Sequence, residues 1–277
     1  MDSKPGAVTR QPNIWIDTDV ALGAPAGDVD DGFALAFLFS LARRGRIRVL
    51  GISTVDGNTD ASTAAGCARA LVSLFELDVP VVSGPAAATR MAKLTSGSSI
   101  LAIGPLTNVA RAIREDPTLP IRTELRVVAT VSRPLCAPHL VPFDLNVKRD
   151  RVAARACLGA EFRRLRVFPL DVVSRLRFGA DVLDRLSSLG TPCAYVAGHA
   201  RRWLARTPFM SMGRDAREGI GLWRSFLWRA FPVWDLVAAM EAADSLPNAR
   251  FVGSVLESFD VDAATESFLD TLRLRAR

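Results

Sequence analysis

The feature that most constrains the fold is a regular alternation of short apolar segments with longer helical patterns. Buried strands are predicted at Ile14–Ile16, Ile47–Val55, Val79–Val82, Ser99–Ile103, Leu125–Thr130 and Leu165–Leu170. Helical patterns lie between them, at Gly32–Arg44, Asp60–Leu77, Thr107 onward and Arg151–Leu158. Strands that alternate with helices of this length form βαβ units. The sequence therefore predicts an α/β fold in which helices flank a mostly parallel central sheet.

The pattern becomes mostly helical after Phe178. The remaining predicted elements are helices at Pro192–Thr207, Trp223–Met240 and Asp262–Arg275, and a strand at Phe251–Phe259. No internal repeat or low-complexity linker marks a second unit. We therefore expect residues 13–277 to form one domain, preceded by a flexible tail over residues 1–12.

The composition excludes several classes of protein. Of the 277 residues, 49% are hydrophobic and 23% are charged, which is enough apolar material for a large core. No apolar run reaches the roughly 18 residues that a membrane span needs, so we expect no membrane association. The polar start lacks the apolar stretch of a secretory signal, and a cytoplasmic location is the default expectation.

The basic charge does not by itself indicate nucleic-acid binding. The net charge is +6, but the arginines are scattered and form no recognised nucleic-acid module. We therefore predict a small-molecule partner and no nucleic acid. The four cysteines are far apart and lack metal-type pairing, so we expect reduced, mostly buried thiols.

The most informative segment is a group of aspartates near the N-terminus. The first strand runs into Asp17 and Asp19, and Asp30 and Asp31 open the next helix, with Asp28 just before them. Strand end and helix start meet at one edge of the sheet, so these carboxylates can converge. Such a group needs a cation, Ca²⁺ in preference to Mg²⁺. The simpler alternative is that Asp30 and Asp31 only offset the helix dipole.

This pattern resembles the opening of the nucleoside hydrolase family, where a strand runs into D-x-D-x-x-x-D-D and a helix of small residues. Here the loop between the two halves, Val20–Gly27, is longer. The resemblance implies a nucleoside hydrolase fold, a calcium ion and hydrolysis of the N-glycosidic bond of ribonucleosides. It implies that Asp19 is the general base and a calcium ligand, that Asp31 is a second ligand, that Asp30 holds ribose hydroxyls, and that Asp17 supports them.

Two further turns carry the resemblance. Val55-Asp56-Gly57-Asn58 matches the family's V-x-G-N, which implies that Asn58 contacts the sugar. The run Ile103-Gly104-Pro105-Leu106-Thr107-Asn108 matches G-P-L-T-N, and the residue before this glycine gives its carbonyl to calcium. Ile103 is therefore the implied carbonyl ligand, because such a ligand does not depend on the side chain.

The later motifs depart further from the family. Asp144 and Asn146, with Asp150 after them, resemble E-F-N-x-x-x-D, which implies contacts to the ribose 5′ side. A loop in which Asp150 caps a helix explains this segment equally well. Trp234-Asp235 stands where the family has His-Asp, so Asp235 is an implied calcium ligand and Trp234 is a candidate to stack against the base or simply a packed residue.

Two alternatives remain open. A strand that ends in D-x-D also opens Mg²⁺-dependent haloacid-dehalogenase-like phosphatases, although no downstream Lys and late acidic pair complete that chemistry here. The missing histidine is equally compatible with a catalytically weakened or inactive relative that binds a nucleoside or ribosyl ligand. The family resemblance further implies a role in nucleoside catabolism and a homodimer or homotetramer.

Overall fold

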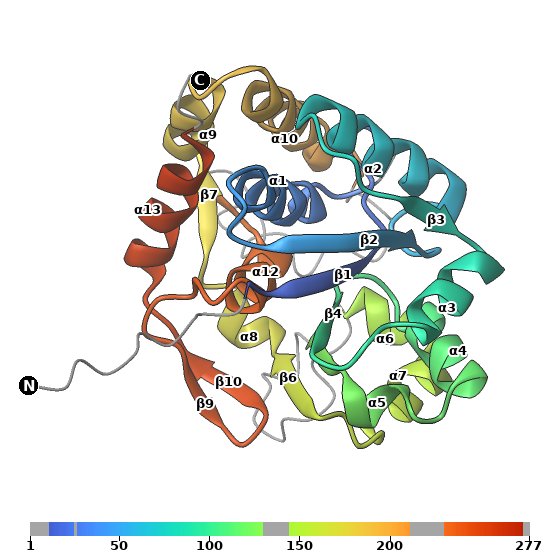
Figure 1. Cartoon of the computed structure of the whole chain (residues 1–277). Helices are drawn as coiled ribbons and strands as arrows, with labels where there is room; N and C mark the ends of the chain where they lie inside the picture. The colour runs from blue at the N-terminus through green and yellow to red at the C-terminus, as the bar shows by residue number, and fades with distance from the viewer. Residues whose placement is uncertain (1–10, 25–26, 130–143, 211–229, 274–277) are drawn as a thin grey trace, which may run out of the picture.

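The computed structural model describes residues 11–24, 27–129, 144–210 and 230–273 (Figure 1). The predicted N-terminal tail falls almost wholly outside this part of the chain, as does the first portion of the helix predicted at Trp223–Met240. The predicted extent of the single domain stays a prediction.

The centre of the structure is an eight-stranded sheet in the order β3-β2-β1-β4-β5-β6-β10-β9. Its strands are β1 (Asn13–Thr18), β2 (Arg48–Thr54), β3 (Val81–Ser83), β4 (Ser98–Ala102), β5 (Glu124–Val128), β6 (Arg164–Phe168), β9 (Arg250–Val252) and β10 (Val255–Ser258). All neighbours pair in parallel except β9 and β10, which are antiparallel. The predicted α/β fold with a mostly parallel sheet is confirmed.

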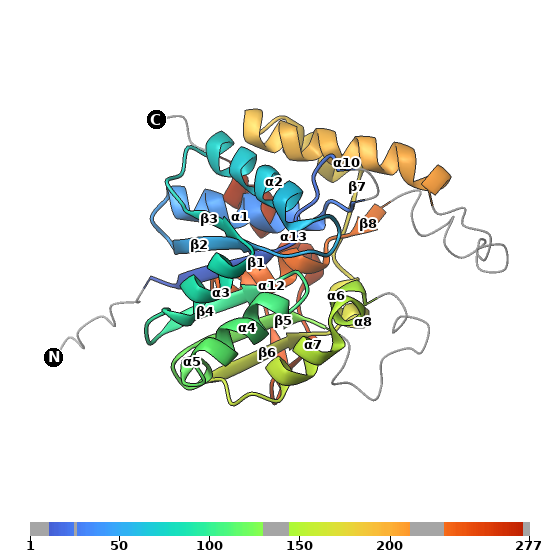
Figure 2. The ribbon, with the colours of Figure 1, turned by 90° about the vertical axis from the view of Figure 1, so that its right-hand side faces the viewer.

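Helices cover both faces of this sheet. They are α1 (Asp30–Arg43), α2 (Ala61–Leu74), α3 (Pro85–Ala92), α4 (Thr107–Glu115), α5 (Leu119–Arg122), α6 (Leu145–Arg149), α7 (Arg151–Leu158), α8 (Leu170–Val173), α9 (Ala180–Ser187), α10 (Thr191–Met210), α12 (Trp234–Ala242) and α13 (Val261–Leu272). One core contains α1, α12 and α13, and a second contains α3, α4 and α7. Figure 2 shows α2 and α10 on the α1 side of the sheet and α4, α5 and α7 on the other.

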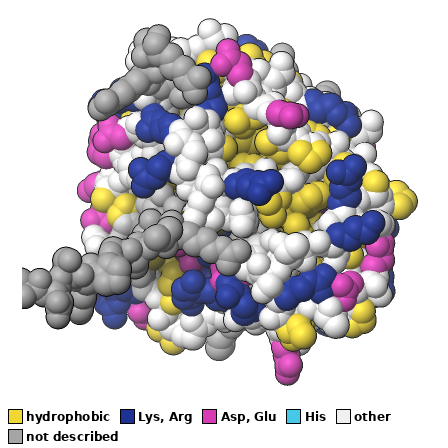
Figure 3. All heavy atoms as spheres, viewed as in Figure 1, with side chains coloured by type: hydrophobic (Ala, Val, Ile, Leu, Met, Phe, Trp, Pro, Cys, Tyr) yellow, Lys and Arg dark blue, Asp and Glu magenta, His cyan; other side chains and the backbone are white. Residues whose placement is uncertain are grey.

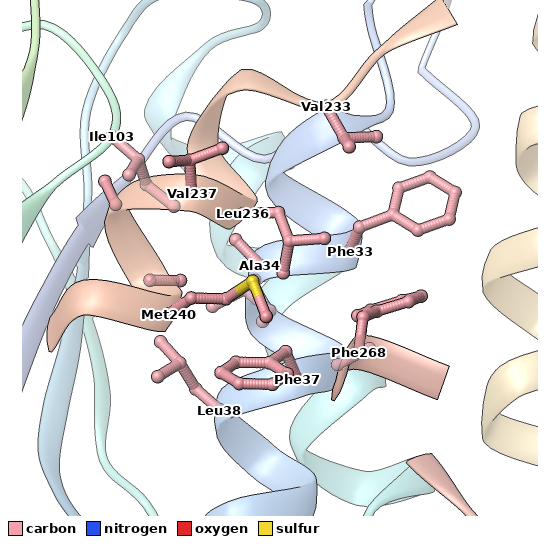
Figure 4. Packing of buried hydrophobic residues seen from close by; sticks show 14 of the residues in the cluster. Phe33, Ala34, Phe37, Leu38, Ile103, Val233, Leu236, Val237, Met240 and Phe268 are labelled. Atoms are coloured by element: carbon pink, nitrogen blue, oxygen red, sulfur yellow. The ribbon is translucent and has the colours of Figure 1, made fainter. Parts of the chain in front are cut away.

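Helix α1 is the centre of the larger core. Every residue from Asp30 to Leu41 is buried, because α12, α13 and α10 pack around the helix. Phe33 lies 5.4 Å from Phe178, 5.7 Å from Phe231 and 6.1 Å from Phe268, measured between ring centroids. Figure 4 shows Phe33 and Phe268 converging beside Leu236. A helix that is apolar on all sides is expected only where neighbours surround it.

Two predictions in the C-terminal part were wrong. The segment Ala230–Pro232 is not helical but forms β8, which pairs antiparallel with β7 (Arg177–Gly179). The phenyl ring of Phe231 fills the core next to Phe33, so tertiary packing overrides the local helical pattern. The single strand predicted at Phe251–Phe259 is a hairpin, because Gly253 takes a left-handed conformation with φ of 58°.

No helix in the described part of the chain is long and apolar enough to cross a membrane. Cys157 and Cys193 are buried free thiols, and Cys67 is a half-buried one. Burial raises the pKa of Cys157 to about 12 and that of Cys193 to about 11. Cys136 lies outside the described residues. On the face drawn in Figure 3, Lys and Arg side chains are spread out rather than gathered into one stripe.

Replacing Phe33 with Ala should destabilise the fold strongly. Its side chain is fully buried against three aromatic rings, so the substitution leaves a cavity that the packed helices cannot close. We expect a loss of about 3–5 kcal/mol in the free energy of unfolding, measured by denaturant titration. Phe33→Leu, which keeps most of the volume, is the matched control and should cost much less. Equal effects of the two substitutions would contradict this account of the core.

Candidate metal and ribose site

The candidate site lies where β1 ends and α1 begins. Asp17 is the next-to-last residue of β1, and Asp19 follows that strand directly. Asp30 and Asp31 lie in the first turn of α1. Because β1 lies between β2 and β4, the turns after those two strands reach the same edge of the sheet. Asp235 joins them from the first turn of α12, which packs against α1.

Five carboxylates gather at this edge. Carboxylate oxygens of Asp28, Asp30 and Asp31 lie within 4.8 Å of one another. Asp19 interacts electrostatically with Asp28 and Asp31, and Asp235 interacts with Asp28, Asp30 and Asp19. Asp28 is half-buried, and the other four are at most 4% exposed. The predicted convergence of acidic side chains from strand and helix is therefore present.

Burial and mutual repulsion raise the pKa values of four of these carboxylates, those of Asp19, Asp30, Asp31 and Asp235. Burial is the largest cause at Asp19, whose pKa rises to about 7 although the backbone N–H of Asn58 lowers it. Burial also dominates at Asp30, Asp31 and Asp235, where neighbouring carboxylates push the pKa further above its ordinary value. Without a cation, the cluster therefore has to retain protons near neutral pH.

The hydrogen bonds in the cluster leave oxygens available for a cation. Asp19 Oδ2 accepts from the backbone N–H of Asn58 at 2.6 Å, while Asp19 Oδ1 has no partner. Asp31 Oδ1 accepts from the hydroxyl of Thr18, while Asp31 Oδ2 has no partner. Buried carboxylate oxygens without donors are costly unless a positive charge faces them. This all-oxygen set fits a hard divalent cation.

A second layer of polar residues lies beneath Asp19. Asp17 Oδ1 accepts from Ser53 Oγ at 2.5 Å and from Asn108 Nδ2 at 2.9 Å, and the indole of Trp15 donates to Ser53 Oγ at 2.9 Å. Burial raises the pKa of Asp17 to about 7 against the effect of these donors. The network ties β1 to β2 and to α4, so it agrees with the supporting role predicted for Asp17.

Asn58, Asn146 and Ile103 lie close to the acidic cluster. The side-chain amide of Asn58 donates to Asp28 Oδ1 at 3.4 Å. The amide of Asn146 donates to the carbonyl oxygen of Ile103 at 3.0 Å. A Cβ added to Gly104, the residue after Ile103, would lie 3.2 Å from Asp19 Oδ1. The turn after β4 is therefore adjacent to the cluster, and the carbonyl expected to bind a cation has a polar partner from α6.

Two predicted residues have local roles that do not join them to the cluster. Asp144 accepts from the backbone N–H of Val147 at 2.9 Å and caps α6. Trp234 is half-buried at the start of α12, and its indole donates to Ser174 Oγ at 2.8 Å. No described contact joins either side chain to the five carboxylates. Asp150 caps α7, as the simpler interpretation of that segment predicted.

The longer loop between the two halves of the motif is packed inward. Val20, Ala21 and Leu22 are buried, and Leu22 lies against Gly32 in the first turn of α1. Gly23 lies against the ring of His199 from α10. The described residues from Val20 to Gly23 therefore fill space between α1 and α10, and Asp19 and Asp28 lie in the same cluster.

Three residues in the site had no predicted role as a ligand or substrate contact. Asp28 belongs to the tightest carboxylate group, Thr18 donates to Asp31, and Asn108 bridges Asp17 and the carbonyl of Thr54. The spacing Asp28-Val29-Asp30-Asp31 was a usable signal for Asp28. The two donors could not be identified from sequence, because their partners lie 13 and 91 residues away.

Comparison with known proteins agrees with this geometry. The sequence pattern of the family described as inosine-uridine preferring nucleoside hydrolase matches residues 14–98. No curated protein sequence matches the chain. Among solved structures, a plant nucleoside hydrolase is similar with a TM-score of 0.71 and 15% identity, covering 95% of this chain and 99% of that one.

Two further solved structures are also similar to this chain. The inosine-uridine preferring nucleoside hydrolase from Bacillus anthracis has a TM-score of 0.66 and 13% identity, covering 95% of this chain and 99% of that one. The type III effector protein XopQ, solved in complex with adenosine diphosphate ribose, has a TM-score of 0.66 and 14% identity, covering 95% of this chain and 94% of that one.

The class of protein is therefore an α/β protein with the nucleoside hydrolase fold. The match over residues 14–98 adds the family's sequence pattern at the acidic cluster itself. The chain therefore resembles the nucleoside hydrolases in fold and, over residues 14–98, in sequence pattern, so the resemblance predicted from its motifs is confirmed.

Replacing Gly57 with Ala should disable the cluster without unfolding the protein. A Cβ at this position would lie 1.9 Å from Asp19 Oδ2, so the carboxylate has to move. We expect the rise in melting temperature caused by calcium to be lost, while the circular dichroism spectrum stays unchanged. Gly66→Ala is the matched control, because a Cβ there meets nothing within 4 Å. An unchanged calcium effect in Gly57→Ala would show that Asp19 is not a ligand.

The pH dependence of stability should reveal the raised pKa values. Asp19 and Asp17 have folded pKa values of about 7, above the ordinary 3.8, so the folded protein binds more protons than the unfolded chain between these values. Without divalent cations, stability should therefore fall as pH rises from 5 to 8. Calcium at about 100 times its Kd should restore roughly 3 kcal/mol at pH 8.

The measurement is the melting temperature at each pH with calcium and with chelator. The difference between the two conditions cancels groups away from the site, including His199, whose pKa is lowered by burial. A calcium effect that is no larger at pH 8 than at pH 5 would contradict the linkage between cation binding and these carboxylates.

Proposed function

We propose that the protein hydrolyses the N-glycosidic bond of ribonucleosides in a calcium-dependent reaction, releasing the base and ribose. The observation that carries this proposal is the cluster of five converging carboxylates, two of which have a buried oxygen without a hydrogen-bond donor. The nucleoside hydrolase fold and the family pattern over residues 14–98 support it.

Asp19, Asp31 and Asp235, with the carbonyl of Ile103, are the proposed calcium ligands. Asp28 is a further candidate, because its carboxylate lies with those of Asp30 and Asp31. Calcium, when bound, would order a water molecule and lower its pKa. It would also replace the protons that the repelling carboxylates retain.

Asp19 is the proposed general base. The N–H of Asn58 fixes one of its oxygens, and the other has no protein partner and can accept a proton from water. With the cation bound, the carboxylate would be ionised and ready to accept that proton. The surrounding negative charge favours the positive charge that develops on the ribosyl ring as the bond to the base breaks.

The proposed substrate contacts come from residues near the same edge of the sheet. Asp30, Asn58, Asp144 and Asn146 are the proposed contacts to ribose hydroxyls, which would fix the sugar beside Asp19. Trp234 is the proposed surface for the base, and its indole is already oriented by Ser174. Since a tryptophan cannot protonate the departing base at this position, we expect substrates with good leaving groups to react fastest.

Asp19→Asn should nearly abolish base release while the fold is retained. Loss of a general base typically costs about 10²- to 10⁴-fold in kcat. The measurement is release of free base from purine nucleosides, pyrimidine nucleosides and nicotinamide riboside, with calcium and with chelator. Asp181→Asn, at an exposed position in the first turn of α9, is the matched control and should keep full activity. Full activity in Asp19→Asn would exclude it as the base.

A second candidate function is ribosyl-ligand binding without turnover. It is favoured by Trp234 at the position of the family's histidine, and the similar XopQ structure is a complex with adenosine diphosphate ribose. Calorimetry with ribosyl compounds and the same base-release assay separate the two functions. Calcium-dependent binding without release of any base would support this second candidate, whereas release of a base excludes it.

A further inference from the structure

The site has a second, oppositely charged region beside the acidic cluster. Three neighbouring helices carry six exposed cations, which we call the cationic face: Arg111 and Arg114 of α4, Lys148 and Arg149 of α6, and Arg151 and Arg155 of α7. Helices α4, α6 and α7 lie side by side, and α6 lies toward the edge of the sheet where β1 ends (Figure 2).

The six side chains of the cationic face make no direct ion pair within the described residues, although Asp150 lies near Arg111 and Arg114. Exposed arginines on other faces, such as Arg185 and Arg201, are instead paired with carboxylates. A surface hollow of about 410 Å³ is lined by Arg111, Arg114 and Glu115 of α4 together with Pro85 and Ala88 of α3, so two cations and one carboxylate border it. Unpaired arginines beside a hollow are suited to bind an anion.

The carboxylates on the same helices already accept hydrogen bonds from the protein. Asp150 accepts from the N–H of Ala153 at 2.9 Å and from Thr107 Oγ1 at 2.8 Å. Its pKa is lowered first by the bond from Ala153, and Arg111 and Arg114 lower it further, so both guanidinium groups lie near it. Asp144 caps α6, and Glu115 accepts from Thr89 Oγ1 at 3.3 Å.

The cationic face is joined to the acidic cluster by α6. Asn146 donates to the carbonyl of Ile103 at the cluster. Arg149, three residues later, lies on the same face of this helix, and Lys148 lies on the adjoining face. A ligand that carried negative charge at the sugar ring would be repelled by the acidic cluster. A ligand whose anionic group lies a few atoms away from the ring would place that group over α6, where positive charge is unpaired.

We propose that the ligand held at the acidic cluster is a phosphorylated ribosyl compound, and that the cationic face binds its phosphate. This inference rests on the proposed function, because it names the substrate class of the same site. Recognition of an uncharged nucleoside would leave Lys148 and Arg149 without a role, because no contact within the described structure explains their presence. Binding of a phosphate gives both residues a role.

Binding of ribose 5-phosphate and ribose, each measured by calorimetry in the presence of calcium, tests the proposal. The phosphorylated sugar should bind about tenfold more tightly or better, and raising the ionic strength should reduce the difference. The double variant Lys148→Gln and Arg149→Gln should lose most of this preference while its affinity for ribose is unchanged. Equal affinities for the two sugars in the natural protein would overturn the proposal.

The matched control is the double variant Arg46→Gln and Arg48→Gln. Both residues are exposed before or at the start of β2, the end of that strand away from the site. This variant removes the same charge and should keep the preference for ribose 5-phosphate. If it lost the preference as fully as the α6 variant, the effect would come from net charge and the cationic face would be excluded as the phosphate site.

Failure of the proposed function gives a different result. Release of base is measured from a nucleoside and from its 5′-monophosphate, and a lower KM for the monophosphate that depends on Lys148 and Arg149 agrees with the inference. Absence of base release from every compound would contradict the hydrolase, while the sugar-binding measurement would still decide the phosphate site.

Discussion

The main physical constraint on this structure is the need to hold several buried carboxylates, which repel one another, close together where β1 meets α1. Asp19, Asp30, Asp31 and Asp235 are almost inaccessible to solvent, and burial keeps their pKa values above the ordinary range. Such an arrangement costs folding free energy, and a protein retains it only where the rest of the fold compensates. Thr18 donates to Asp31 and the backbone N–H of Asn58 donates to Asp19, which limits that cost. Ser53 and Asn108 stabilise the neighbouring Asp17 in the same way.

The scaffold holds these side chains in place from a distance. Helix α1 is enclosed by apolar neighbours along its length, so its first turn cannot move away from the end of β1. Helix α12 carries Asp235 in its first turn and Glu241 near its other end, where Glu241 pairs with the buried guanidinium of Arg126 on β5. The two ends of α12 therefore lie in opposite electrostatic environments: an ion pair holds one end, and the acidic cluster repels the carboxylate at the other.

The relation to nucleoside hydrolases of only 13–15% identity follows from the same physics. A parallel sheet needs apolar residues at buried positions but tolerates many choices among them. An oxygen-lined cation site, by contrast, needs carboxylates at fixed places. The acidic residues that meet at the strand–helix junction are present in this chain, although the loop from Val20 to Gly27 is longer than in the motif that it resembles and Trp234 precedes Asp235.

The sequence by itself determined the alternating elements, the parallel sheet and the acidic group, because strand and helix periodicity and adjacent aspartates are local signals. Only the tertiary structure decided that Ala230–Pro232 is a strand, since the contact of Phe231 with Phe33 joins residues about 200 positions apart in the chain. It also decided which donors reach Asp17 and Asp31. Contacts between distant segments depend on how helices pack, and no local pattern encodes that packing.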